Sequence, residues 1–128
     1  MIADPISDFI IRLQNASRAG KVSVSLPTSK VKVAIAEVLR REGYLAAVEV
    51  VKKSNSLVVS LAQKQGAPAI TGVKRLSKPS RRLYMGVRDV RPIKRGFGLL
   101  LLSTPNGILT GKEAKEARVG GEMLFEIW

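Results

Sequence analysis

The chain has 128 residues, and 22 lysines and arginines against 10 aspartates and glutamates give it a formal net charge of +12. This length favours one domain or two small subdomains, and a hydrophobic content of 45% argues against disorder. The sequence contains no cysteine and no histidine, which excludes disulfides and thiolate chemistry and argues against zinc sites and the commonest general base. The basic excess indicates a polyanionic partner, nucleic acid ahead of an anionic membrane surface.

Nothing in the sequence predicts a membrane protein. No wholly apolar run approaches the ~20 residues that cross a bilayer. Met1 leads directly into a helix start at Asp4-Pro5, whereas a signal peptide has a charged region followed by an apolar stretch. We therefore expect a soluble cytoplasmic protein with no membrane partner.

The first elements are a helix and a strand. Asp4 suits the N-cap of a helix, Pro5 suits its first position, and Gly20 can close it. Apolar residues recur at helical spacing between these two ends. Residues 21–26 then alternate apolar and polar side chains, which predicts a half-buried strand with Val22 on its inner face.

A second helix follows, and then a hairpin. Thr28 or Ser29 caps this helix, and Gly43 ends it. The strand-like runs 44–51 and 57–61 flank a polar loop, which predicts a β-hairpin. The best candidate for a linker comes next, at residues 63–68, because glycine, proline and glutamine are concentrated there.

The second half is predicted to be mostly β. The expected elements are strands over 70–76, 81–87, 96–102 and 122–128, a turn at 77–80, and a short helical turn at 89–94. Thr110 and Glu113 form a capping box, T-x-x-E, which predicts a short helix that ends near Arg118.

The predicted fold class is therefore α/β, more specifically α+β, with two small subdomains. Residues 1–65 form an N-terminal subdomain with the order helix-strand-helix-strand-strand. Residues 70–128 form a C-terminal subdomain that is mostly β with one short helix.

Positive charge is concentrated in one segment. Residues 74–95 contain nine lysines and arginines and one acid, and a looser group surrounds the entry to the second helix. Such a block is typical of phosphate contacts, although a solvated basic face remains the alternative. The candidate phosphate-binding residues are Arg12, Lys30, Lys32, Lys78, Arg81, Arg82, Lys112 and Lys115.

A stretch without charge carries the candidate selective contacts. Ser103, Thr104, Pro105, Asn106 and Gly107 follow four leucines. Their hydroxyls, amide and backbone groups suit base edges and 2′-hydroxyls, although the stretch alone predicts no more than a loop between strand and helix.

Other residues extend this candidate set. The carboxylate of Glu122 can accept hydrogen bonds from base amino groups or from a ribose hydroxyl. Tyr84 can stack on a base, or it can pack against other side chains of the protein. Glu122 and Glu126 are four apart in an expected strand and so should share a face, where they could instead protect a sheet edge. The role of Glu126 stays open.

No constellation predicts catalysis, a metal or a cofactor. Residues 107–112 resemble a phosphate loop but are one residue short, and Glu113 stands where a Mg²⁺-binding hydroxyl is needed. An enzyme that acts on RNA is therefore one disfavoured alternative. A protein that coats nucleic acid without specificity is another, and it predicts strongly salt-dependent binding with little preference among duplexes.

Five motifs stand in a fixed order along the chain. They are Asp4-Pro5-Ile6-Ser7-Asp8 with Arg12 and Asn15-Ala16; residues 27–35 with Glu42-Gly43-Tyr44; residues 75–79 with Arg81-Arg82 and Tyr84; Ser103-Thr104 with Gly107 and Thr110; and Gly120-Gly121-Glu122. With these motifs in this order, the chain resembles a known family, bacterial-type small-subunit ribosomal protein S-eight. The chain departs from the family pattern at Ser80, at Pro105-Asn106 and at Glu126.

The resemblance implies a two-domain protein that binds the central domain of 16S-type ribosomal RNA (rRNA) early in small-subunit assembly. It assigns the main contact to the C-terminal domain, through the Ser-Thr loop and the segment Gly120-Gly121-Glu122, and further rRNA contacts to the N-terminal domain. Neighbouring small-subunit proteins, protein five among them, are implied partners. Binding to its own operon messenger RNA as a translational repressor is also implied, for a chain that is monomeric when free and belongs to a cytoplasmic or organellar ribosome.

Overall fold

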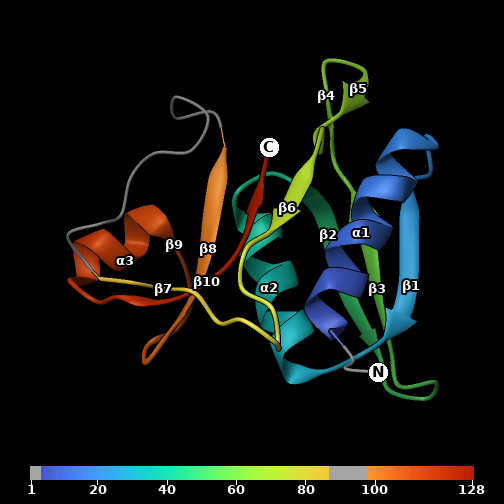
Figure 1. The fold of residues 1–128 in the computed structure, drawn as a ribbon. Coiled ribbons are helices and arrows are strands. Elements are labelled where there is room, and N and C mark those ends of the chain that lie inside the picture. The colour runs from blue at the N-terminus through green and yellow to red at the C-terminus, as the bar shows by residue number, and fades with distance from the viewer. Residues whose placement is uncertain (1–3, 87–97) are drawn as a thin grey trace. The chain divides into compact units, whose positions relative to one another are not determined.

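A computed structural model describes residues 4–86 and 98–128. The chain divides into two compact units, one spanning Pro5–Gly72 and the other containing Asp4 and Val73–Trp128. The three helices and the antiparallel sheets of these residues confirm the predicted α+β class. Figure 1 shows the order of the elements along the chain.

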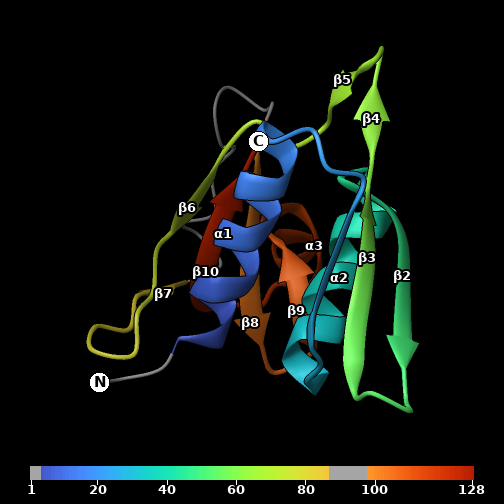
Figure 2. The same cartoon turned by 90° about the vertical axis from the view of Figure 1, so that its right-hand side faces the viewer.

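The N-terminal unit packs two helices on one sheet. Figure 2 shows α1 and α2 on the same face of the antiparallel sheet, whose strand order is β1-β3-β2. Its elements are α1 Pro5–Arg18, β1 Ser23–Pro27, α2 Lys30–Arg41, β2 Leu45–Val51, β3 Ser56–Leu61, β4 Gln63–Lys64 and β5 Ala67–Pro68.

Local sequence signals place both helices correctly. Phe9, Ile10 and Leu13 of α1 are buried at helical spacing. Ser29 is the N-cap of α2, and its hydroxyl accepts the backbone N–H of Lys32. Gly43 follows the C-cap with φ +91°, a left-handed conformation that glycine adopts without steric cost.

Two details of this unit differ from the expectation. Val22 lies outside β1 and is 70% exposed, because the strand begins one residue later. Residues 63–68 are not a linker but a short hairpin of β4 and β5 within the N-terminal unit. Gln65 and Gly66 make its turn, both with positive φ.

The C-terminal unit is one sheet with a helix on one face. Its strands follow the order β6-β10-β8-β9, and β7 also pairs with β10. Its elements are β6 Val73–Arg75, β7 Tyr84–Met85, β8 Leu99–Thr104, β9 Gly107–Thr110, α3 Gly111–Ala117 and β10 Gly121–Ile127. The capping box at Thr110 and Glu113 is confirmed as the start of α3.

Two predicted strands of this unit were too long, and one strand was not predicted. The expected strands 70–76 and 81–87 shrink to β6 and β7, and the turn between them closes at a bridge between Lys78 and Arg81. The sequence pattern predicts a loop where the structure has β9, which forms a hairpin with β8. The helical turn expected at 89–94 and the start of the strand expected at 96 lie outside the described residues.

A bulge in β10 separates two side chains that were expected to share a face. Glu122 pairs with Ser103 and Glu126 pairs with Leu100, with an extra residue inserted between Met123 and Phe125. Ser103 and Leu100 are three apart in β8, so they point to opposite faces. The prediction that Glu122 and Glu126 share a face was therefore wrong.

Each face of the sheet has its own surroundings. Leu102, which pairs with Met123, belongs to a buried cluster with Ala114 of α3. Ser103 and Glu122 form the neighbouring residue pair of the two strands, so they point away from α3. Glu126 lies directly opposite Lys74 of β6, an opposite-charge pair of the kind that stabilises sheets.

The backbone approaches very closely at the start of β10. A Cβ atom added at Gly120 would collide with the backbone of Met85, and one added at Gly121 with the carbonyl group of Ser103. Neither obstacle is the flexible end of a side chain, so the strands would have to move apart. Two consecutive glycines therefore allow β10 to run between β7 and β8.

We predict that Gly121→Ala destabilises the protein, because the new methyl group overlaps the carbonyl group of Ser103. The free energy of unfolding should fall by about 1–3 kcal/mol, the usual cost of overpacking. Urea titration followed by circular dichroism measures this change. A variant as stable as the unsubstituted chain would contradict the close approach.

Candidate functional site

Three predicted site residues lie side by side on paired strands. Glu122 of β10 pairs with Tyr84 of β7 on one side and with Ser103 of β8 on the other. Side chains that are directly opposite in antiparallel strands share a face and lie about 5 Å apart. A phenol, a carboxylate and a hydroxyl therefore form one row on the face that points away from α3. Tyr84 is 70% exposed within this row.

The uncharged loop is the tip of the β8–β9 hairpin. Thr104 pairs with Gly107 across the two-residue turn Pro105-Asn106. Proline fixes φ near −65°, which excludes the usual two-residue hairpin turns, and Gly107 supplies the positive φ of +102° instead. The conformation of the turn therefore depends on Pro105 and Gly107, and one residue, Thr104, separates the turn from Ser103.

The Thr104 hydroxyl is used inside this turn. It donates to the carbonyl oxygen of Gly107 at 2.9 Å and accepts the backbone N–H of Asn106 at 3.1 Å. A hydroxyl has two lone pairs, so one acceptor position remains. The side chain that was predicted to contact RNA therefore also holds the tip in shape.

Three cations lie in the segment next to the row. Lys78, Arg81 and Arg82 are all exposed in the segment between β6 and β7. Within the described residues, Lys78 and Arg81 have no acidic partner, whereas Arg82 lies 3.3 Å from a carboxylate oxygen of Glu122. Lys112 and Lys115 are exposed on α3 of the same unit, and α3 packs on the opposite face of the sheet from the row.

A buried serine supports the row, and sequence reasoning missed it. Ser77 is fully buried and its hydroxyl donates to Oε2 of Glu122 at 2.5 Å. In the sequence it reads as the first residue of a turn. The only signal that could have indicated more is its place within the basic segment, residues 74–95.

The glycines that were predicted to contact RNA also have roles in the sheet. Gly120 and Gly121 permit the close strand approach, and Gly107 closes the hairpin. Each is therefore needed for the geometry of the row and its tip, apart from any contact that its backbone makes.

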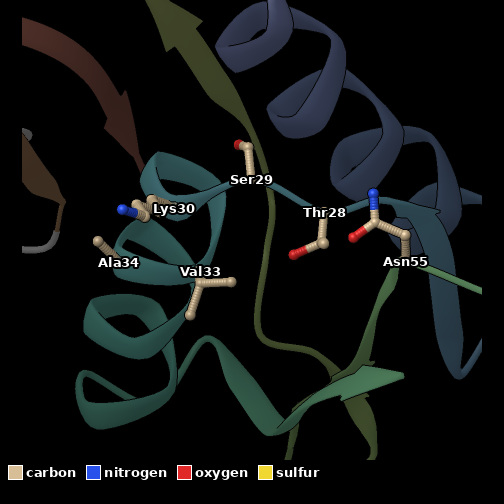
Figure 3. A pocket seen from close by; sticks show the side chains of 6 residues that line it. All are labelled: Thr28, Ser29, Lys30, Val33, Ala34 and Asn55. Atoms are coloured by element: carbon tan, nitrogen blue, oxygen red, sulfur yellow. The ribbon is translucent and has the colours of Figure 1, made fainter. Parts of the chain in front are cut away.

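The remaining candidates lie in the N-terminal unit. Arg12 is exposed and forms an ion pair with Asp8 at 3.1 Å. Lys30 is exposed at the start of α2, where it lines an open pocket of about 520 Å³ together with Thr28, Ser29 and Asn55 (Figure 3).

Lys32 differs from its neighbour Lys30. It is only 7% exposed, and its ammonium group donates to the carbonyl oxygen of Pro27 at 2.9 Å. Lys32 is the third residue of α2, and its side chain points inward against the end of β1. Its positive charge is therefore bonded inside the N-terminal unit.

Further features of the described residues concern metal binding, membrane spans and a shifted pKa value. Residues 4–86 and 98–128 contain no group of three acidic side chains that could hold a metal ion, and no described helix could span a membrane. Burial raises the pKa of Tyr44, and the negative charge of Glu42 adds to this shift. Tyr44 therefore stays protonated at neutral pH.

Comparison with known proteins decides the family. The family model described as Ribosomal protein S8 matches residues 4–128. The chain belongs to the ribosomal protein S8 family. It is 43% identical over 128 residues to the small ribosomal subunit protein uS8 of Nitratidesulfovibrio vulgaris (strain DSM 19637 / Miyazaki F), covering 100% of both chains.

Two further relatives have nearly the same identity to this chain. The uS8 protein of Roseiflexus castenholzii is 42% identical over 130 residues, which cover 99% of this chain and 98% of the relative. That of Dechloromonas aromatica is 43% identical over 125 residues, which cover 96% and 95%. The ribosomal protein S8 family is a class of structural, non-enzymatic components of the small ribosomal subunit. The family resemblance found in the sequence is therefore confirmed.

We predict that Thr104→Val loosens the hairpin tip, because valine keeps the shape of threonine but loses both hydrogen bonds of the hydroxyl. The free energy of unfolding should fall by about 1 kcal/mol. Thr104→Ser, which keeps the hydroxyl, is the matched control in the same urea titration. Equal stabilities of the two variants would show that the hydroxyl does not hold the turn.

Proposed function

We propose that the C-terminal unit binds an irregular helix in the central domain of small-subunit rRNA. The observation that carries this proposal is the row of Tyr84, Glu122 and Ser103 on one face of the sheet, extended by the uncharged hairpin tip. Irregular RNA exposes bases and 2′-hydroxyls that such donors and acceptors can contact.

Attraction and selectivity come from different residues in this proposal. Lys78, Arg81 and Arg82 contact phosphates beside the row, whereas Lys112 and Lys115 on α3 lie on the opposite face of the sheet and add to the positive charge of the unit. Phosphate contacts position a protein on RNA but carry no sequence information. The row and the uncharged tip, residues 103–107, therefore discriminate between RNA sequences and shapes. The tip itself contains no cation that would attract every duplex equally.

The N-terminal unit makes secondary contacts through Lys30 and Arg12. Lys30 stands at the N-terminal end of α2, where the helix dipole favours an anion and the first turn holds no acid. The buried hydroxyl of Thr28, beside the same pocket, has no hydrogen-bond partner among the described residues. We assign Lys32 a structural role, because its ammonium is bonded to Pro27.

The proposal includes the surroundings of the protein. The chain acts in the cytoplasmic ribosome, beside protein five and other small-subunit proteins. Its own operon messenger RNA, where it folds into a similar irregular helix, is bound by the same face and competes with rRNA.

We predict a marked preference for the irregular rRNA helix over a plain duplex of matched length, measured by fluorescence anisotropy over a salt series. Glu122→Ala should reduce that preference by on the order of 1–3 kcal/mol, the scale of one specific contact. Glu126→Ala is the matched control, since it lies on the opposite face of the same strand and should change nothing. Equal binding of all duplexes by the unsubstituted chain would overturn the proposal in favour of a non-specific coating protein.

We also predict which cations contact phosphates. Arg81→Ala and Lys30→Ala should each reduce the slope of log affinity against log salt by about 1, because each removes one phosphate contact. Lys32→Met, a neighbouring cation of α2, should leave the slope unchanged, with folding checked by circular dichroism. An equal loss of slope for Lys32→Met and Lys30→Ala would contradict the assignment of Lys32 to the interior.

A further inference from the structure

Ser77 has a position that neither its turn sequence nor its polarity explains. It precedes the bridge between Lys78 and Arg81, and its side chain is 0% exposed. Its backbone N–H donates to the carbonyl oxygen of Met123 at 3.1 Å, which fixes the residue against β10. A buried hydroxyl costs free energy unless it is hydrogen-bonded, so its partners indicate its purpose.

The donor and the acceptor in each hydrogen bond of the Ser77 hydroxyl can be assigned. The backbone N–H of Leu83 donates to Oγ of Ser77 at 3.0 Å. An amide N–H can only donate, so Oγ accepts there, and its single proton is free for the second partner. That proton points to Oε2 of Glu122, 2.5 Å away.

This bond outweighs the other contact of the carboxylate. Arg82 lies 3.3 Å from both oxygens of Glu122, and its side chain is 56% exposed. Exposed ion pairs of that length contribute little and are screened by salt. The Glu122 side chain is 13% exposed, and a short hydrogen bond from a buried donor fixes its orientation more strongly.

The orientation leaves one oxygen available. Oε2 receives the short bond from the Ser77 hydroxyl, whereas among the described residues Oε1 receives only the long contact from Arg82. Arg82 is exposed, so it is free to turn to a phosphate, which would leave Oε1 as an acceptor in the row between Tyr84 and Ser103.

We propose that Ser77 is a positioning residue for RNA recognition, which holds Oε2 of Glu122 so that Oε1 faces the RNA as an acceptor for an amino group or a 2′-hydroxyl. The inference rests on the proposed function, because it requires Glu122 to take part in selectivity. Ser77 itself is buried and touches no RNA. It acts through the carboxylate.

Ser77→Thr and Ser77→Val form the matched pair that tests this. Both add the same bulk in a buried place, and only threonine keeps the hydroxyl. Both variants are compared at a temperature at which circular dichroism shows them folded, and the readout is the ratio of affinities for the irregular rRNA helix and the plain duplex. We expect Ser77→Thr to retain the ratio and Ser77→Val to lower it about tenfold, the scale of a hydrogen bond to a charged group.

Ser77→Ala, which adds no bulk, replaces Ser77→Val in the comparison if the larger side chains prevent folding. The same substitution combined with Glu122→Ala supplies the readout that a merely structural role would not give. With no carboxylate to hold, removal of the hydroxyl should cause no further loss of the ratio.

The outcomes separate this inference from the proposed function. If Glu122→Ala lowers the ratio but loss of the Ser77 hydroxyl does not, Ser77 is not a positioning residue and the proposed function stands. If loss of the hydroxyl lowers the ratio equally with and without Glu122, Ser77 acts by another route and the inference fails. If the unsubstituted chain shows no preference, the proposed function itself fails.

Discussion

Strand β10 runs between β7 and β8 at a distance that leaves no room for a side chain at Gly120 or Gly121. Every cross-strand neighbour of Glu122 depends on that approach, since Tyr84 and Ser103 are placed by pairing on either side of the same residue. A sheet opened by a single methyl group would separate the phenol, the carboxylate and the hydroxyl together. The glycines thus set the spacing of the whole candidate interface.

The bulge after Met123 is the second constraint, because it decides which side chains share a face. Without the inserted residue, the alternation of β10 would bring Glu126 to the side of Glu122 and turn Phe125 toward α3. With it, one strand presents Glu122 on the proposed RNA face and sets Glu126 opposite Lys74. Two identical side chains four residues apart therefore have different surroundings, one in the proposed interface and one within the sheet.

Much of the fold could be predicted from short-range signals. Ser29, Gly43 and the capping box at Thr110 set helix ends through hydrogen bonds and φ angles that involve only neighbouring residues. The errors have a common cause. The hairpin at 63–68, strand β9 and the bulge depend on pairing with a partner strand, and pairing register is not written in the local pattern of glycines, prolines and apolar residues.

The candidate site was predictable in its composition but not in its internal bonds. Counting charges finds the basic segment, yet it cannot show that the ammonium of Lys32 is bonded to Pro27 while Lys30 is exposed. Ser77 was missed for the converse reason, since a serine at the start of a turn is ordinary until Glu122, 45 positions later in the sequence, is placed beside it. A carboxylate next to a basic segment would be drawn to whichever arginine is nearest, and such a contact changes with salt. A buried serine hydroxyl carries no net charge and is shielded from solvent ions, so its hydrogen bond to Glu122 depends less on salt than the contact with Arg82 does.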